Sequence, residues 1–227
     1  MAPMLEPLSD DLFVQDVPFR AAGLSLGGRM SVVRLPEGGL WVHSPIPLKE
    51  EVRRAVDALG PVRFLVAPNL MHHLALGDWA AAYPSARVLA PSGLRKKRPE
   101  LRIDAELSNV LDLGQMPTLD QLGTHGIPRL DEFVFLHRPS RSLLLTDLAF
   151  NIHHSPSWAT RTYLKLCGAW QRLAPTVMIQ LLLRDRSAFR ASVDRMLCWD
   201  FDRVVPCHGQ VLEHGGKEAL REAFSWV

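Results

Sequence analysis

The fold is decided by the stretch from Val62 to Ala90, which reads VRFLVAPNLMHHLALGDWAAAYPSARVLA. It begins with an apolar run at Val62–Ala67 that predicts a buried strand. The spacing of apolar residues then predicts a helix across His72–Ala82, and a second strand follows at Arg87–Ala90. Because strands alternate with a helix here, the stretch favours a layered α/β fold.

Upstream of this stretch, the chain has the pattern of β-hairpins. Short runs rich in Val, Leu and Phe are separated by Pro or Gly, as is typical of strands joined by turns. One helix is expected between Leu48 and Leu59, where apolar residues recur at helical spacing. The expected strands are Phe13–Asp16, Phe19–Leu24, Met30–Leu35 and Leu40–His43.

The second half of the chain returns to β structure after a basic loop at Leu94–Arg98. Two similar halves that pack their sheets together, with helices outside, would form a four-layer αββα sandwich. No linker-like composition divides the chain, so we expect one domain over residues 1–227. The expected strands are Val110–Leu113, Leu119–Gly123, Phe133–His137, Ser142–Thr146 and Arg203–Pro206, and the expected helices are Trp158–Leu173, Ser187–Trp199 and Lys217–Trp226.

The composition excludes several classes of protein. Of the 227 residues, 47% are hydrophobic, and 26 basic residues nearly balance 24 acidic ones, for a net charge of +2. This excludes a disordered chain and argues against a nucleic-acid-binding protein, which would need a strongly basic face. We expect a small-molecule substrate or ligand and no nucleic-acid or membrane partner, while the oligomeric state stays open.

The cysteines and the first residues of the chain indicate the cellular compartment. Cys167, Cys198 and Cys207 are too few for a disulfide framework, which favours a reducing compartment. The start, MAPMLEPLSDD, has acids and prolines where a secretory signal needs a basic run and an apolar stretch. No apolar segment approaches the roughly 20 residues that span a bilayer. We therefore expect a cytoplasmic protein.

Histidines are the side chains that could carry chemistry. The sequence has no glycine-rich phosphate loop, no G-x-S-x-G motif and no CxxC pair. In layered α/β folds, sites form where loops converge at strand ends. Imidazole and carboxylate groups there suit Zn²⁺, Fe²⁺ or Mn²⁺, which keep a position for water and lower its pKa to about 7. The candidates at or just after strand ends are His43, His72, His73, His125, Asp147 and His208.

The order of these motifs resembles the metallo-β-lactamase superfamily. A strand is followed by a histidine cluster and a helix, then by Gly-x-His-Gly, by an apolar strand ending in Asp, and by Pro-x-His-Gly. The resemblance runs from about Phe19 to Val227. It implies an αββα sandwich with metal at one edge between the sheets. His125 falls at a later histidine ligand of the family, Asp147 at its bridging aspartate and His208 at its final histidine. Within the superfamily, four runs look like a bacterial branch, namely Pro68-Asn-Leu-Met-His-His, Phe135-Leu-His-Arg-Pro-Ser, Leu145-Thr-Asp-Leu and Pro206-Cys-His-Gly.

The main signature of that superfamily, His-x-His-x-Asp-His, is degenerate here. From Asn69 the chain reads Asn-Leu-Met-His-His-Leu, which puts Asn69 and Met71 at the first two histidines, His73 at the aspartate and Leu74 at the last histidine. A dinuclear centre is therefore not expected.

We expect instead a site for one divalent metal, with zinc favoured and iron or manganese open. Its core would be His73, Asp147 and His208, with His43, His72 or His125 as a fourth ligand or in the outer shell.

Two functions stay open at this point. The first is a metal-dependent hydrolase in which a metal-bound hydroxide attacks a small ester, lactone, thioester or phosphodiester, and in which Asp147 ligates the metal or orients the water. The second is a non-catalytic protein of the same fold, a ligand-binding or assembly module without metal. Asn69 and Met71 favour it, because neither side chain ligates a hard divalent ion well. A redox use of iron at the same residues is a third, weaker alternative.

Overall fold

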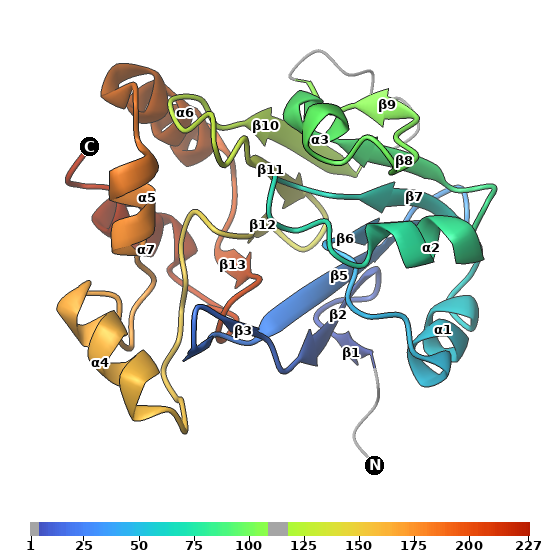
Figure 1. Cartoon of the computed structure of the whole chain (residues 1–227), viewed down its shortest axis with the longest axis horizontal. Helices are drawn as coiled ribbons and strands as arrows, with labels where there is room; N and C mark the ends of the chain where they lie inside the picture. The colour runs from blue at the N-terminus through green and yellow to red at the C-terminus, as the bar shows by residue number, and fades with distance from the viewer. Residues whose placement is uncertain (1–4, 109–117) are drawn as a thin grey trace.

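The computed structural model describes residues 5–108 and 118–227, and two β-sheets form the centre of this part (Figure 1). One sheet has the strand order β1-β2-β5-β6-β7-β8-β9 and the other β10-β11-β12-β13, while β3 and β4 form a separate hairpin. The strands of the first sheet and the hairpin are β1 (Glu6–Pro7), β2 (Leu12–Val17), β3 (Arg20–Ala21), β4 (Leu24–Ser25), β5 (Gly28–Arg34), β6 (Leu40–His43), β7 (Val62–Val66), β8 (Arg87–Ala90) and β9 (Ala105–Glu106).

The second sheet and the helices complete the described chain. The strands are β10 (Leu119–Gly123), β11 (Phe133–His137), β12 (Ser142–Leu145) and β13 (Arg203–Pro206). The helices are α1 (Glu50–Asp57), α2 (Leu76–Ala82), α3 (Ser92–Lys97), α4 (Trp158–Leu166), α5 (Val177–Leu182), α6 (Arg186–Cys198) and α7 (Gly216–Ala223).

Side chains that alternate along the strands divide the core into layers. Trp41 and Phe64 point between the sheets, where they share a cluster with Phe135 of the second sheet. Their neighbours Val42 and Leu65 point to the other face of the first sheet, which helices α1 and α2 cover. Helices α6 and α7 cover the outer face of the second sheet. The order helix, sheet, sheet, helix confirms the predicted αββα sandwich.

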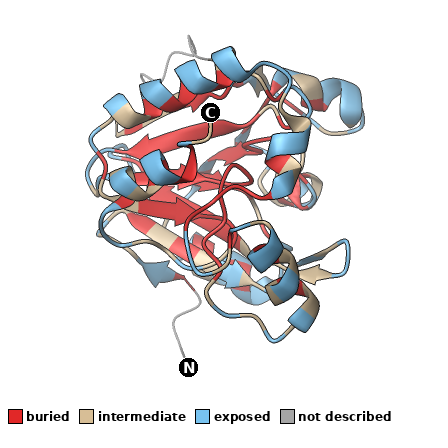
Figure 2. Cartoon of the chain, turned by 90° about the vertical axis from the view of Figure 1, so that its left-hand side faces the viewer, coloured by how far each residue is buried: buried red, intermediate tan, exposed pale blue. Residues whose placement is uncertain are grey.

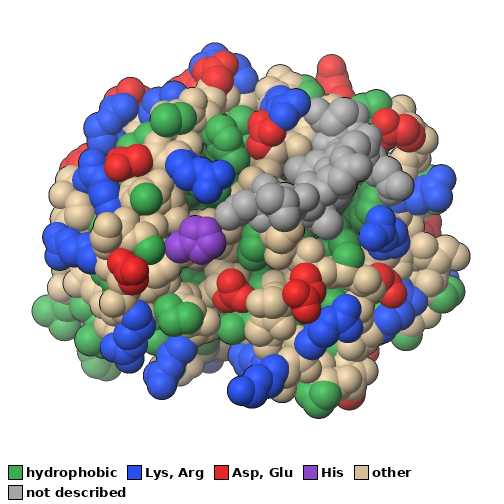
Figure 3. Space-filling model, turned by 90° about the horizontal axis from the view of Figure 1, so that it is seen from above, with side chains coloured by type: hydrophobic (Ala, Val, Ile, Leu, Met, Phe, Trp, Pro, Cys, Tyr) green, Lys and Arg blue, Asp and Glu red, His purple; other side chains and the backbone are tan. Residues whose placement is uncertain are grey.

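Burial follows this layering. Strands β6, β11 and β12 are buried at every position, whereas the helices present exposed residues to the outside (Figure 2). On the face seen in Figure 3, basic and acidic side chains are interspersed, as the near balance of charge in the sequence suggests. Within the described residues, no helix has the length and apolarity needed to cross a membrane.

Several predicted boundaries are wrong. The helix expected across His72–Ala82 begins only at Leu76, because turns occupy the residues before it. The basic loop at Leu94–Arg98 lies mostly within helix α3, and the strand at Phe19–Leu24 is a short hairpin.

Two further differences concern the second half of the chain. The helix expected to reach Leu173 ends at Leu166, before Gly168 with its positive φ of 66°, and the short helix α5 was not expected. The strand predicted at Val110–Leu113 lies outside the described residues.

Candidate metal centre

Three side chains converge where the two sheets meet at one edge. The Nε2 atoms of His72 and His208 lie 3.2 Å apart. Asp147 lies against both, with Oδ2 3.3 Å from Nε2 of His72 and Oδ1 3.3 Å from Nε2 of His208. No other group of His, Cys, Asp or Glu within the described ranges has a spacing that could hold a metal ion. We refer to His72, Asp147 and His208 as the candidate metal cluster.

Strand pairing explains why two members of the cluster meet. Strands β12 and β13 run parallel, and Leu145 pairs with Pro206. Asp147 and His208 each lie two residues beyond this pair, so both leave the sheet at the same edge. The next residue, Gly209, has a φ of +97°, and a Cβ there would stand 2.1 Å from the carbonyl oxygen of Asn151. Glycine is therefore required directly after His208.

The third member, His72, comes from the other sheet. It lies in the turn between β7 and α2, and Asn69 shapes that turn by accepting hydrogen bonds at Oδ1 from the backbone N–H groups of Met71 (2.8 Å) and His72 (2.7 Å). Such a side-chain turn competes with helix formation, which explains why α2 starts late. The turn directs His72, and not His73, to the cluster.

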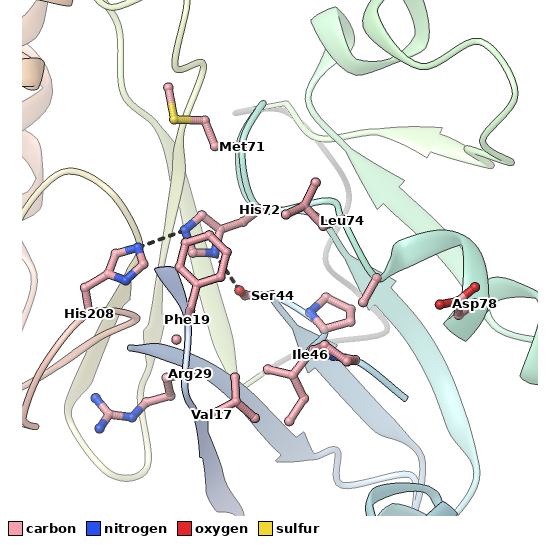
Figure 4. A pocket seen from close by; sticks show the side chains of 14 residues that line it. Val17, Phe19, Arg29, Ser44, Ile46, Met71, His72, Leu74, Asp78 and His208 are labelled. Atoms are coloured by element: carbon pink, nitrogen blue, oxygen red, sulfur yellow. Dashed lines mark hydrogen bonds between the residues drawn. The ribbon is translucent and has the colours of Figure 1, made fainter. Parts of the chain in front are cut away.

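Both histidines are oriented by hydrogen bonds on their far nitrogen. His208 Nδ1 lies 2.7 Å from the carbonyl oxygen of Gly27, so this nitrogen carries the proton and donates it. The Nε2 atom of His208 then faces Asp147 and His72. His72 Nδ1 lies 2.8 Å from the Ser44 hydroxyl (Figure 4). Metal-ligating histidines in proteins are held in this way.

The spacing of the cluster fits one transition-metal ion. Ligand atoms about 2.0–2.1 Å from a tetrahedral zinc lie about 3.3–3.4 Å from one another. The two Nε2 atoms lie 3.2 Å apart, and each lies 3.3 Å from a different oxygen of Asp147. One ligand atom from each of the three residues can be chosen so that all three lie within 4.8 Å of one another. Two imidazoles and one carboxylate are also the donor types that zinc, iron and manganese accept. The residues present therefore fit a mononuclear site.

The electrostatics of the cluster require a positive charge beside Asp147. Burial alone would raise the pKa of Asp147, but His72 and His208 hold it well below the usual range of an aspartate. Burial opposes a charge on His72, yet the Asp147 carboxylate raises the pKa of His72 well above its ordinary value. A protonated His72 can thus neutralise Asp147, and a bound cation would do the same.

A network of buried hydrogen bonds holds Asp147 in place. The amide nitrogen of Asn69 lies 2.8 Å from Oδ2 of Asp147 and 3.0 Å from Oε2 of Glu132. Glu132 also accepts hydrogen bonds from the backbone N–H groups of Thr146 (2.8 Å) and Asp147 (2.9 Å). Burial, and then the neighbouring charge of Asp147, raise the pKa of Glu132. The network fixes the backbone and the side chain of Asp147 together.

The other three candidates lie outside the cluster. His73 is buried, and its Nδ1 lies 3.1 Å from Nη1 of Arg98 at the end of α3. His43 is buried between Trp41 and Phe135, with ring centroids 5.3 and 5.5 Å away, and burial lowers its pKa to about 3.

His125 is exposed, and its backbone N–H donates to the hydroxyl of Ser192 in α6. The structure therefore brings together His72, Asp147 and His208 but not His43, His73 or His125.

The sequence did not indicate Glu132, Ser44 or the carbonyl of Gly27. Glu132 follows Asp131 directly before a strand, and nothing in the local pattern separates the buried acid from its half-buried neighbour. Ser44 did follow the candidate His43. Its φ of +52°, unusual for a residue other than glycine, marks a tight turn out of β6 but is visible only in three dimensions.

Comparisons with known proteins address the fold. A family model described as a domain of unknown function (DUF4336) matches residues 15–94. The comparison with curated proteins gives no match.

Solved structures with a similar fold cover almost the whole chain. A metallo-β-lactamase from Pontibacter korlensis superposes with a TM-score of 0.65 at 13% sequence identity, over 97% of this chain and 96% of that one. The mono-zinc form of the metallo-β-lactamase FIM-1 from Pseudomonas aeruginosa gives a TM-score of 0.61 at 11% identity, over 96% and 93%. The Flv1 flavodiiron core from Synechocystis gives 0.65 at 13% identity, over 98% of this chain and 60% of that one.

These likenesses agree with the layers and the strand order described above. They confirm, at the level of the fold, the resemblance that the strand-end motifs suggested. The chain has the metallo-β-lactamase fold.

Proposed function

We propose that this protein is a mononuclear metal-dependent hydrolase that acts on a small molecule. The observation that carries the proposal is the spacing of the candidate metal cluster. Its two Nε2 atoms lie 3.2 Å apart, each lies 3.3 Å from an oxygen of Asp147, and hydrogen bonds fix both ring orientations. Zinc is the favoured ion, with iron or manganese as alternatives. A bound metal of this kind acts as a Lewis acid that polarises the scissile group and lowers the pKa of a coordinated water.

The protein's own residues have distinct roles in this proposal. His72, Asp147 and His208 hold the ion, while Ser44 and the Gly27 carbonyl keep both imidazoles turned toward it. Asn69 orients Asp147. It does not serve as a ligand, because both ends of its amide are engaged in hydrogen bonds. Asn69 stands at the position of the first histidine of the family signature. Because it does not bind metal there, it supports a site for one metal rather than two.

The substrate in this proposal is an ester, lactone, thioester or phosphodiester. The three cysteines, Cys167, Cys198 and Cys207, are unpaired, which supports the proposed cytoplasmic location.

A non-catalytic protein of the same fold is the second candidate. One observation favours it. His72 and Asp147 can form an ion pair, so the negative charge of Asp147 is neutralised without a metal. In that case the pocket beside the cluster would bind a ligand without turning it over.

Metal content decides between the two. We expect purified protein reconstituted with zinc to hold one ion per chain, and His208→Ala to lose it. His125→Ala is the matched control, since this exposed histidine lies outside the cluster, and it should keep the ion. Hydrolysis of chromogenic esters and phosphodiesters, abolished by a chelator, would support the enzyme. If His208→Ala still holds one ion per chain, the proposed site is wrong. Absence of both metal and turnover in the wild-type protein would favour the second candidate.

A further inference from the structure

A pocket of about 270 Å³ opens directly onto the candidate metal cluster (Figure 4). His72 and His208 form one end of it. Its sides come from the end of β2 and Phe19 beyond it, from the start of β5, from the loop after β6, and from the turn before α2. Apolar side chains dominate the lining, among them Val17, Phe19, Ile46, Met71, Leu74 and Ala75.

The pocket suits a small ligand. Pockets for drug-sized ligands usually measure about 300–1,000 Å³. A volume of about 270 Å³ lies just below that range and leaves room for a short chain or a small ring beside the cluster. Part of the wall is held in place, because the indole N–H of Trp79 donates to the carbonyl oxygen of Ile46 at 2.7 Å. The space is therefore preformed.

The charged side chains of the lining disfavour an anion. Arg29 is buried, and both edges of its guanidinium group are engaged. Nε and Nη2 each lie 2.7 Å from an oxygen of Asp16, and Nη1 lies 2.7 Å from the carbonyl oxygen of Pro206. In Figure 4 its guanidinium points away from Ile46 and Leu74. The other charged lining residue, Asp78, is acidic.

Among the described lining residues, a phosphodiester would thus find Arg29 already paired with Asp16, and His72 already paired with Asp147. It would also share the pocket with the acid Asp78. Buried charges without partners are costly, and phosphoryl-transfer sites usually supply Arg or Lys for them. An uncharged carbonyl compound does not incur this cost.

Leu74 extends the apolar lining to the rim of the pocket, where it is 69% exposed. An apolar chain in the pocket would cover it.

We infer that this pocket binds the short apolar acyl part of an uncharged ester, lactone or thioester, and that it rejects phosphodiesters. The inference rests on the proposed function for the reaction, and it adds the substrate class. The carbonyl carbon would lie next to His72 and His208, with the chain directed toward Ile46 and Leu74.

The test measures binding to the full chain after removal of metal by a chelator, so that it does not depend on turnover. The probes are the uncharged amides acetamide, butanamide and hexanamide, with dimethyl phosphate as the anionic comparison, and chemical-shift changes give each Kd. Each buried methylene adds roughly fourfold in affinity. We expect hexanamide, which has two more methylenes, to bind about 16-fold more tightly than butanamide. Dimethyl phosphate should bind far more weakly than hexanamide.

Two variants locate the binding. Leu74→Asp should weaken hexanamide binding roughly tenfold. Leu181→Asp, at a leucine of α5 that is 70% exposed and does not line the pocket, should leave it unchanged. Affinity that does not depend on chain length, equal effects of the two variants, or dimethyl phosphate binding as tightly as hexanamide would overturn the inference.

Failure of the inference and failure of the proposed function are distinguishable. If hexanamide binds as expected but no metal-dependent turnover is found, the hydrolase proposal fails while the acyl pocket stands. If zinc binds and phosphodiesters are hydrolysed in preference to esters, the hydrolase proposal stands while the inferred substrate class is wrong.

Discussion

The amide nitrogen of Asn69 lies 2.8 Å from Oδ2 of Asp147, and the same asparagine accepts the backbone N–H of His72 at 2.7 Å. One neutral side chain thereby positions two members of the candidate metal cluster, one from each sheet. A histidine at this position could not bond to the carboxylate and to both backbone N–H groups in the same way, because imidazole has one donor and one acceptor when neutral.

Asn69→Ala should therefore weaken metal binding. Loss of a group that orients metal ligands typically costs 10–100-fold in metal affinity. We expect this range for zinc, together with a loss of about 1–3 kcal/mol in unfolding free energy from unpaired buried groups. Competition with a chromophoric chelator measures the zinc affinity, and urea unfolding of the metal-free chain measures the unfolding free energy. An unchanged zinc affinity would show that Asn69 serves only the fold.

Ser44→Ala tests the orientation of His72. The Ser44 hydroxyl lies 2.8 Å from His72 Nδ1, and its removal should lower zinc affinity about tenfold. Ser140→Ala is the matched control, because Ser140 lies 2.7 Å from Nδ1 of His137 in the same kind of pair but outside the cluster. If both variants change zinc affinity equally, the role assigned to Ser44 is wrong.

Glu132→Gln should destabilise the fold. Glu132 is fully buried and accepts three N–H bonds, so replacing one oxygen by an NH₂ group sets donor against donor. We expect a loss of about 1–3 kcal/mol in unfolding free energy. Glu51→Gln, on the exposed side of α1, should change it by less than about 0.5 kcal/mol. Thermal and urea unfolding of both variants provide the comparison, and equal stabilities would contradict the network.

Zinc should stabilise the protein by mass action. At a free zinc concentration about 100 times the Kd, binding to the folded state alone adds about 2.7 kcal/mol to the unfolding free energy. The gain should vanish in His208→Ala and persist in His125→Ala. A rise in melting temperature of similar size in all three proteins would indicate binding elsewhere.

Acid should destabilise the fold through His137. Burial lowers the pKa of His137 from 6.5 to about 4, so between these values the unfolded chain binds more protons than the folded one. The contribution of His137 to stability is therefore complete above about pH 6.5 and is lost as the pH drops toward 4, by about 3 kcal/mol. His137→Phe removes this titrating group and should make the decline of unfolding free energy less steep over this range, while the contribution of the buried His43 remains. The same slope in both proteins would contradict the assignment.

The sequence by itself determined the layers of the fold. Adjacent apolar residues such as Phe64 and Leu65 point to opposite faces of a strand, so both faces must be buried. Such strands exist only between other layers of the fold. It also placed Asp147 and His208 each just after an apolar strand, whereas the parallel pairing that brings both strand ends to the same edge was visible only in the tertiary structure. The layers and the two strand ends follow from the local periodicity of apolar residues, which can be read directly from the sequence.

Only the tertiary structure decided which histidine joins them. His72 and His73 are adjacent and chemically identical, and the choice depends on the turn that Asn69 makes with the following N–H groups. Likewise, Glu132 and Asp131 are indistinguishable in sequence, yet one is buried under Asp147. His43 ends its strand as predicted, but packing against Phe135 from the opposite sheet turns it into the core. Each of these outcomes depends on contacts between distant segments, and no local pattern encodes such contacts.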